Sequence, residues 1–264
     1  MGKVVKIVIL SLSVMFSSCV ALHRSNIKFA DNPVVAHRGA FKKMKLPENS
    51  IASLKHAIAL RCTGTEFDVH MTADNVLVLN HDHDYFKVPV EKTDYTVLNQ
   101  HKLSNGESLP LLKTALQEGM KNNSTTMLIC EIKSSSISKE RGQYVAEKIL
   151  EMVKELRAEK YMVYISFDFD ILKKILEIDP SANTQYLNGD KTPLELKQAG
   201  IKGADYNFSV FKKNPHWIKM AKENNIALNA WTVNNENDMK WLLENNFDYI
   251  TTDEPEKLFD IIKQ

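Results

Sequence analysis

The sequence lacks a large net charge of either sign. Its 34 basic and 33 acidic side chains give a formal charge of +1 over 264 residues, so the charge balance gives no reason to expect a nucleic-acid-binding protein. The most apolar run, Ile7 to Phe16, is shorter than the roughly 20 residues that a membrane-spanning helix needs. No low-complexity segment follows it. What is present, 44% hydrophobic and 25% charged residues, matches an ordinary globular domain.

The first residues have the features of a secretory signal. Lys3 and Lys6 give a positive start, the apolar run follows, and Ser17-Ser18 precedes Cys19. A cysteine at this place resembles the lipobox of a bacterial lipoprotein, although Phe16 stands where Leu or Val is usual. We therefore expect Cys19 to be the lipidated N-terminus of an exported bacterial lipoprotein, anchored to a membrane on its periplasmic or cell-surface side. The alternative is ordinary cleavage nearby, which leaves Cys19 free or removes it.

The chain that remains has the length of one barrel domain. If residues 1–18 are a signal peptide, 246 residues are left with a formal charge of −1. That length is close to the ~250 residues typical of a (β/α)₈ barrel. We expect residues 19–31 to be a short tether and residues 32–264 to be the barrel. Residues 82–110 lack a clear repeat and are expected to form an insertion over the site.

Strand-like and helix-like segments alternate from Pro33 onward, which favours a parallel sheet covered by helices. The nine strand-like segments are Val34–His37, Thr65–Met71, Val76–Asn80, Met127–Ile132, Tyr161–Phe167, Thr184–Leu187, Asp205–Phe208, Ala227–Val233 and Tyr249–Thr252. The helical segments are Glu48–Leu60, Gly142–Leu156 and Ile171–Ile178, with others around Leu194, Trp217, Met239 and Leu258.

Nine strands are one more than a (β/α)₈ barrel holds. The link Ala73–Asn75 explains the surplus, because a parallel crossover needs about a dozen residues. We therefore expect residues 65–71 and 76–81 to form an antiparallel hairpin whose second strand rises above the barrel rim. Eight parallel strands remain. The predicted fold is an α/β (β/α)₈ TIM barrel with a small inserted subdomain after the second-strand hairpin.

The hairpin predicts which side chains meet. If Asp74-Asn75 form a two-residue turn, Asp68 lies opposite His81, and directly opposed Cβ atoms are about 4.5–5.5 Å apart. Glu66, two residues before Asp68, shares the same face. A slip of one residue in the register would break this arrangement.

Two cysteines remain in the body of the chain, and in an exported protein they can pair. Cys62 follows the first helix, at the bottom of the expected barrel, whereas Cys130 lies near the top of a strand. A disulfide tolerates only about 4.4–6.8 Å between Cα atoms. We expect both to be buried, unpaired and effectively apolar.

The first strand ends in His37-Arg38-Gly39, at the position where barrel enzymes build active sites. Arg38 can clamp a phosphate oxygen with its planar guanidinium group. Gly39 allows a tight turn. Taken alone, the tripeptide is equally consistent with a buried histidine before a turn.

Three carboxylates, Glu66, Asp68 and Glu131, supply the hard oxygen ligands that Ca²⁺ and Mg²⁺ prefer. The alternative for the first two is a solvated pair at a strand edge. Lys133 shares a face with Glu131, where it can bind a substrate phosphate or only form a salt bridge. His81 would be a suitable proton-transfer group beside a metal, since imidazole titrates near neutral pH.

Together these residue types suit metal-assisted cleavage of a phosphate ester. Trp231 ends a late strand and can wall the substrate pocket, although a rim or core aromatic is an almost equal alternative. His56, His83, His101 and His216 lack comparable partners in the sequence and are interpreted as surface or structural residues.

Several short motifs, in order along residues 34–255, resemble the glycerophosphodiester phosphodiesterase family. They are His37-Arg38-Gly39, Pro47-Glu48-Asn49-Ser50, Gly64-Thr65-Glu66-Phe67-Asp68-Val69, Thr72-Ala73-Asp74, His81-Asp82, Glu131-Ile132-Lys133, Trp231-Thr232-Val233-Asn234 and Thr252-Asp253-Glu254-Pro255. Two features depart from the family pattern: a lysine-rich spacer at residues 40–46, and Asn75 in place of a turn glycine, which Asn tolerates.

The resemblance implies a (β/α)₈ barrel with a small insertion. It implies His37 and His81 as the acid–base pair, and Arg38 and Lys133 as phosphate contacts. Glu66, Asp68 and Glu131 would hold one Ca²⁺ or Mg²⁺ ion. For Glu48 it implies a role in orienting Arg38 or in helping the metal.

We therefore predict metal-dependent hydrolysis of small glycerophosphodiesters to glycerol 3-phosphate and an alcohol. The attacking group is left open between water and the substrate's own glycerol hydroxyl. One alternative is a phospholipase-type enzyme that cleaves intact lipid phosphodiesters at the membrane surface. Another is a non-catalytic binding lipoprotein on the same fold, but such a protein should have lost one of the site residues, and none is missing.

Overall fold

The computed structural model describes residue 2 and residues 27–263. The expected signal peptide, Cys19 and most of the expected tether lie outside the described residues. Within the described part of the chain, no helix combines the length and apolarity that a membrane crossing requires.

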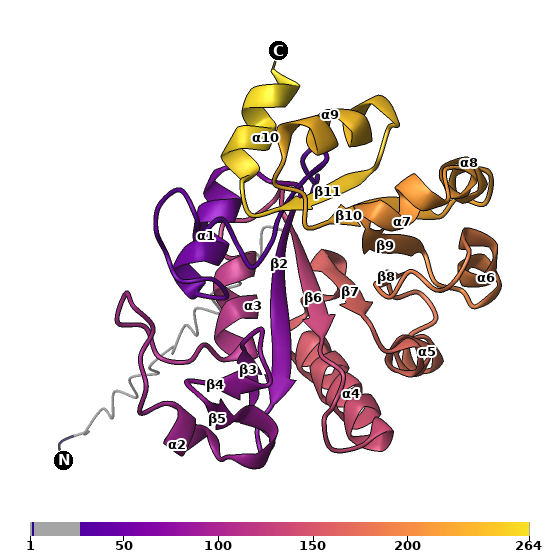
Figure 1. Ribbon diagram of the computed structural model, residues 1–264. Coiled ribbons are helices and arrows are strands. Elements are labelled where there is room, and N and C mark those ends of the chain that lie inside the picture. The colour runs from indigo at the N-terminus through magenta and orange to yellow at the C-terminus, as the bar shows by residue number, and fades with distance from the viewer. Residues whose placement is uncertain (1, 3–26, 264) are drawn as a thin grey trace.

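Eight parallel strands close into a barrel, as predicted (Figure 1). They are β1 Val34–Ala36, β2 Gly64–Met71, β6 Met127–Ile132, β7 Met162–Ser166, β8 Thr184–Tyr186, β9 Gly203–Asn207, β10 Ala227–Trp231 and β11 Tyr249–Thr252. Strand β1 pairs with both β2 and β11, which closes the ring. The (β/α)₈ TIM barrel is confirmed.

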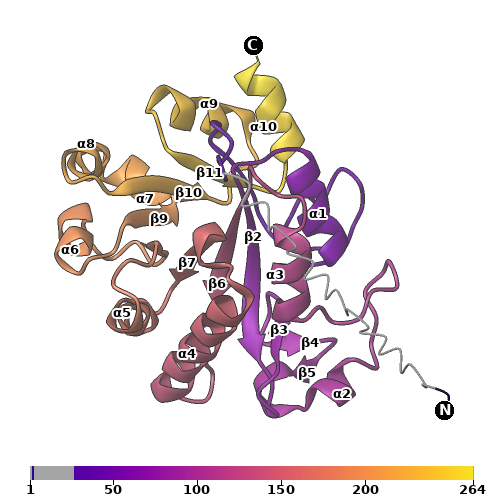
Figure 2. The same ribbon diagram turned by 180° about the vertical axis from the view of Figure 1, so that it is seen from behind.

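Helices cover the outside of the barrel. They are α1 Ile51–Ala59, α3 Leu112–Met120, α4 Lys139–Leu156, α5 Phe169–Ile178, α6 Pro193–Gln198, α7 Phe208–Lys213, α8 His216–Glu223, α9 Glu236–Glu244 and α10 Pro255–Ile262, with a 3₁₀ turn at Glu159–Tyr161. Figure 2 shows α1, α3 and α4 next to one another along one side.

The structure differs from the helix predictions at three places, one of which is α7: its first residue, Phe208, was expected to end a strand. The first helix begins at Ile51 rather than at Glu48, because Ser50 caps it by accepting a hydrogen bond from the Ser53 amide. Helix α3 was not predicted at all. Its first residue follows Leu111, which offers no capping side chain, so the sequence carries no start signal there.

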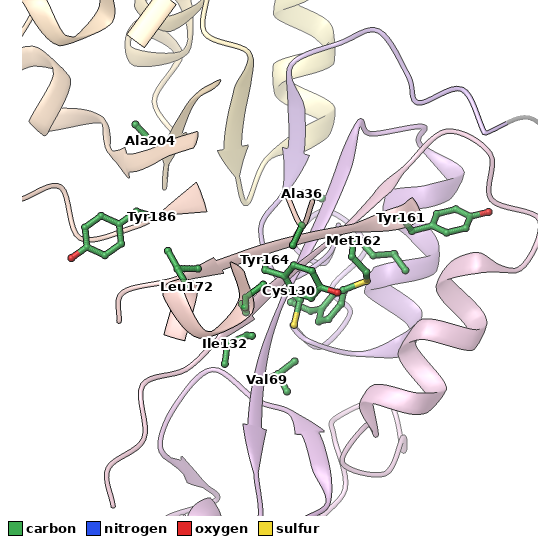
Figure 3. Packing of buried hydrophobic residues seen from close by; sticks show 14 of the residues in the cluster. Ala36, Val69, Cys130, Ile132, Tyr161, Met162, Tyr164, Leu172, Tyr186 and Ala204 are labelled. Atoms are coloured by element: carbon green, nitrogen blue, oxygen red, sulfur yellow. The ribbon is translucent and has the colours of Figure 1, made fainter. Parts of the chain in front are cut away.

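The strands bury side chains on both faces. Inside the barrel, Val35, Ile129, Ile165 and Leu187 belong to one apolar cluster. Residues that alternate with these pack outward against the helices in a much larger cluster. Figure 3 shows part of that outer layer: Val69, Cys130, Ile132 and Tyr164 lie on the barrel strands, and Leu172 comes from a covering helix.

Both cysteines in the described part of the chain are buried and unpaired, as predicted. Burial raises the pKa of the Cys62 thiol to about 12 and also raises that of Cys130. Both therefore behave as small apolar residues in the outer core.

The predicted hairpin is present, but its register differs by one residue. Strand β3, Leu77–Leu79, is antiparallel to β2, with Val69 opposite Leu79. Asp68 is therefore aligned with Asn80, whose amide donates to the Asp68 carbonyl, and not with His81. The link is longer than a two-residue turn: the Thr72 amide donates to the carbonyl of Val76, and Asn75 adopts the left-handed conformation.

The inserted subdomain lies beyond the C-terminal end of β2 (Figure 1). It contains β4 Asp84–Tyr85, β5 Val88–Pro89, a 3₁₀ turn at Val90–Lys92 and α2 Tyr95–Leu98, around its own small apolar cluster. Two carboxylates attach it to the barrel. Glu91 accepts hydrogen bonds from Ser135 and Ser136 after β6, and Glu107 accepts from the first two amides of α1.

The chain enters the barrel from its N-terminal, bottom end. The amides of Lys28 and Ala30 donate to the carbonyls of Ser124 and Thr125, just before β6, at 3.0 and 2.7 Å. Phe29 packs against the inner apolar cluster. Residues 27–30, which the sequence placed in the tether, are therefore bound to the barrel floor.

Candidate active site

The predicted site residues gather at the C-terminal mouth of the barrel. A cavity of about 100 Å³ lies there, and the residues that line it include His37, Arg38, Glu66, His81, Glu131 and Trp231. Asp68 and Lys133 adjoin it through direct contacts with these residues. A larger groove of about 700 Å³ lies outside the barrel, between α1 and the insertion, and contains none of the predicted site residues.

A tight turn after β1 places His37 and Arg38. Arg38 and Gly39 both have positive φ angles, 51° and 81°. A Cβ atom on Gly39 would lie 2.6 Å from the backbone carbonyl carbon of Ser53, so the turn requires glycine. The Arg38 amide donates to Glu66 at 2.7 Å, which ties this turn to the carboxylate on β2.

The three predicted carboxylates meet. Glu66, Asp68 and Glu131 each place one oxygen within 4.8 Å of the others. Sheet pairing explains this, because Asp68 and Glu131 are register partners on neighbouring parallel strands. Lys133 binds two of them, with Nζ 2.7 Å from Glu131 and 3.2 Å from Asp68. The salt bridge that the sequence left as an alternative for Lys133 is therefore present.

Burial gives the three carboxylates different proton affinities. Desolvation, together with Asp68 and Glu131, raises the pKa of Glu66 well above its usual value. Desolvation and Asp68 raise the pKa of Glu131 to about 7. Desolvation acts on Asp68 too, but Lys133, His81 and the side chain of Asn49 outweigh it and lower its pKa.

The raised pKa of Glu131 predicts a pH effect on stability when a chelator is present. The folded protein holds this proton to about pH 7, whereas the unfolded chain releases it near pH 4.5, so this contribution is lost as the pH rises through that window. We expect Glu131→Gln to flatten the pH dependence of the urea unfolding midpoint between about pH 4.5 and about pH 7. Equal pH slopes for wild type and variant would contradict it.

Each candidate acid–base histidine has a carboxylate on one ring nitrogen. His37 Nδ1 is 2.7 Å from Asp253, and His81 Nδ1 is 2.7 Å from Asp82. Asp253 is held in turn by Asn234. Desolvation opposes ionisation of Asp253, but its contacts with His37 and Asn234 outweigh that and lower its pKa. In both histidines this arrangement leaves Nε2 as the ring nitrogen for proton transfer.

His81 reaches the site despite the register difference. Strand β3 ends at Leu79, so the side chain of His81 is no longer bound by strand alternation. It lines the cavity and lies close enough to Asp68 to lower the pKa of that carboxyl. The expectation that a one-residue slip would separate His81 from the carboxylates was therefore wrong.

Arg38 and Trp231 have well-defined supports. Both carboxylate oxygens of Glu48 accept from Arg38 Nη1 at 3.0 Å, so Glu48 orients Arg38. The Trp231 indole N–H donates to the backbone carbonyl of Asp205 at 2.8 Å, and its ring meets Phe167 edge-on.

Several residues of the site were given no role in the sequence analysis. Asn49 donates to the Asp68 carboxylate and accepts from the Asp68 amide. Asn49 and Asp253 both lie in motifs that carry the family resemblance, so the sequence marked them without indicating what they do. Asp205 had no such signal, since it appears only as the first residue of an expected strand.

A barrel with two carboxylate-supported imidazoles, three clustered acids and two cations at its mouth defines a TIM-barrel hydrolase. The sequence profile of the Glycerophosphoryl diester phosphodiesterase family matches residues 37–257, and the chain belongs to that family. The prediction of an enzyme of the glycerophosphodiester phosphodiesterase class is confirmed.

Individual relatives agree with this assignment. A glycerophosphodiester phosphodiesterase of Caldanaerobacter subterraneus is 27% identical over 248 residues, covering 88% of this chain and 98% of the relative. A crystal structure of a glycerophosphodiester phosphodiesterase from Parabacteroides distasonis has a TM-score of 0.85 at 38% identity, covering 89% of this chain and 98% of that one. A phosphodiesterase of Oleispira antarctica, solved with the product sn-glycerol-3-phosphate, shares the fold, with a TM-score of 0.74 at 19% identity over 88% of this chain and 97% of that one.

Proposed function

We propose that this protein hydrolyses small glycerophosphodiesters to glycerol 3-phosphate and an alcohol, with His37 and His81 as the acid–base pair. The observation that carries the proposal is the convergence of two histidines, three carboxylates and two cations on one cavity. The glycerol 3-phosphate complex of the Oleispira phosphodiesterase supports this choice of product.

The carboxylate cluster fits one divalent cation. Glu66 Oε1 is buried and has no hydrogen-bond partner among the described residues. Burial, followed by the charge of Asp68, raises the pKa values of both Glu66 and Glu131. Glu66, Asp68 and Glu131 would hold the ion, and their all-oxygen donor set suits Ca²⁺ or Mg²⁺. When bound, the ion supplies positive charge that stabilises the phosphoryl oxygens during the reaction.

The protein's own groups supply the remaining steps. Arg38, oriented by Glu48, and Lys133 bind phosphate oxygens. One imidazole accepts the proton of the attacking hydroxyl, and the other donates a proton to the leaving alcohol. If the attacking hydroxyl belongs to water, glycerol 3-phosphate forms directly. If it belongs to the substrate's glycerol, a cyclic phosphate forms first, and water then opens it to glycerol 3-phosphate. Asp253 and Asp82 hold the two rings through Nδ1, in the orientation that leaves Nε2 for proton transfer. Trp231 forms one wall of the substrate pocket.

We also propose that the enzyme is an exported lipoprotein anchored through Cys19, on the basis of the N-terminal sequence. Because such an anchor would hold the enzyme at a membrane, intact lipids are an alternative class of substrate. The mouth cavity of about 100 Å³ is smaller than the ~300–1,000 Å³ of pockets that enclose drug-sized ligands. A groove of about 350 Å³ shares His81 with this cavity, so the choice between a small diester and a lipid rests on the substrate panel.

A substrate panel tests the proposed function. We expect purified protein with Ca²⁺ or Mg²⁺ to release glycerol 3-phosphate from glycerophosphocholine and glycerophosphoethanolamine. It should release no phosphatidate or choline from phosphatidylcholine vesicles. Glycerol 3-phosphate is measured by a coupled dehydrogenase assay and lipid products by chromatography. Cleavage of vesicles at the rate of the soluble diesters would favour a phospholipase, and binding without turnover would favour a non-catalytic protein.

A further inference from the structure

Asp205 is an acidic residue inside the barrel that the proposed chemistry does not use. It lies in β9 between Ala204 and Tyr206, which pack outward in the helix-covered core. Asp205 therefore faces inward, and it lines the mouth cavity with only 1% of its surface exposed.

The Asp205 side chain is not satisfied by the described residues. Its Oδ1 atom is buried and has no hydrogen-bond partner among them. The cations of the site bind other acids, Arg38 pairing with Glu48 and Lys133 with Glu131 and Asp68. A buried, unpartnered carboxyl oxygen is costly, so its presence in a ligand cavity indicates that it meets a ligand group.

A neighbouring polar group does not supply the missing contact. Asn229, the register partner of Asp205 on β10, lies against Gln185 on one side and accepts from Thr251 on the other. These groups form a separate chain of contacts within the barrel. Nor does Asp205 belong to the carboxylate cluster, which consists of Glu66, Asp68 and Glu131.

The cavity has two chemically different sides. The wall from β1, β2 and β6 carries His37, Arg38, Glu66 and Glu131, and suits the metal and the phosphate. The wall from the strands β7 to β10 carries apolar side chains that suit the carbon skeleton of the substrate; they are Ile165, Phe167, Leu187 and Trp231. Asp205 is the acidic group on that wall, and its strand β9 stands opposite β2 in the ring of eight strands.

We propose that Asp205 binds the glycerol hydroxyl on the carbon furthest from the phosphate, and so selects glycerol diesters over diesters of less hydroxylated alcohols. This inference rests on the proposed function and assigns a specificity residue to the same site. A carboxyl group can hydrogen-bond to a hydroxyl in either protonation state, so the assignment does not depend on the charge of Asp205.

The test compares glycerophosphocholine with its analogue built on propane-1,2-diol, which lacks only the distal hydroxyl. The analogue keeps the 2-hydroxyl, so either attacking group remains available. We expect the wild type to favour glycerophosphocholine about ten- to hundredfold in kcat/KM, the range for leaving a buried hydrogen-bonding group without its partner. In Asp205→Ala the preference should fall to about threefold or less, since the hydroxyl then has no buried partner.

Control variants separate recognition from structure. Asp205→Asn keeps the side-chain volume and a hydrogen-bonding group, and we expect its preference for glycerophosphocholine to lie between those of wild type and Asp205→Ala. It replaces Asp205→Ala as the test if that variant folds poorly. Asn229→Ala removes a neighbouring buried polar side chain and should lower stability while the substrate preference stays at the wild-type value. Calcium affinity, measured by calorimetry, should be the same in wild type and Asp205→Asn.

The outcomes distinguish this inference from the proposed function. If the wild type turns over glycerophosphocholine and both Asp205 variants keep its substrate preference, only the role of Asp205 is overturned. A tenfold loss of calcium affinity in Asp205→Asn also overturns it, by making Asp205 a metal ligand. If the wild type releases no glycerol 3-phosphate from any diester, the proposed function fails first.

Discussion

Replacing either His37 or His81 with alanine is expected to abolish the release of glycerol 3-phosphate from glycerophosphocholine. Each ring stands at the mouth cavity with a carboxylate on Nδ1, which leaves Nε2 for proton transfer. General acid–base catalysis contributes about 10²–10⁴-fold per group, so we expect kcat to fall by at least about 10²-fold in each variant. The measurement is turnover at saturating substrate and metal.

Two controls make this result specific. Thermal unfolding of each variant should match that of wild type within a few degrees, because both histidines lie at the cavity rather than in the apolar core. His216→Ala removes an exposed histidine at the start of α8 and should leave kcat unchanged. Full activity in His37→Ala or His81→Ala would remove that histidine from the mechanism.

The second large effect is expected from loss of the divalent ion. Chelator should reduce activity to background, and added Ca²⁺ or Mg²⁺ should restore it, because three buried carboxylates converge with their oxygens within 4.8 Å. Glu66→Gln removes a ligand charge and should weaken metal affinity by about tenfold or more, on the scale of losses seen when metal-site residues are changed. Metal should also raise the unfolding temperature of wild type more than that of the variant.

Activity that persists in chelator, without any response to divalent ions, would remove the metal from the mechanism. Glu118→Gln is a suitable control for charge removal. Glu118 lies in α3, on the outside of the barrel, where it pairs with Lys55 and Lys121. This variant should bind metal and turn over substrate as wild type does.

Strand order was predictable because it follows from local pattern and chain length. A three-residue link cannot carry a parallel crossover, and this alone reduced nine strand-like segments to an eight-stranded barrel. Helix α3 escaped prediction because its N-cap residue, Leu111, has no capping side chain, and Pro110 stands before the cap and not at the first helical position. The hairpin register was wrong because Thr72 and Val76 close a longer link than a two-residue turn.

The residues of the candidate site were predicted more accurately than the hairpin register that was used to bring His81 next to Asp68. Parallel pairing of β2 with β6 aligns Asp68 with Glu131 whatever the hairpin does. His81 lies past the end of β3, where the backbone can turn its ring toward the cavity. By contrast, Asp205 could not be recognised from sequence, because its significance depends on burial and on an oxygen without a partner.

The attachment of residues 27–30 beneath the barrel bears on how an anchored enzyme would work. Seven residues separate Cys19 from Ile27, and the eight Cα–Cα steps between them span at most about 29 Å when fully extended. A lipid on Cys19 would therefore anchor the protein at the N-terminal end of the barrel. The active site, at the opposite end, would then face the aqueous compartment. An enzyme anchored in that orientation would act on soluble glycerophosphodiesters in the aqueous compartment and not on the bilayer beneath it.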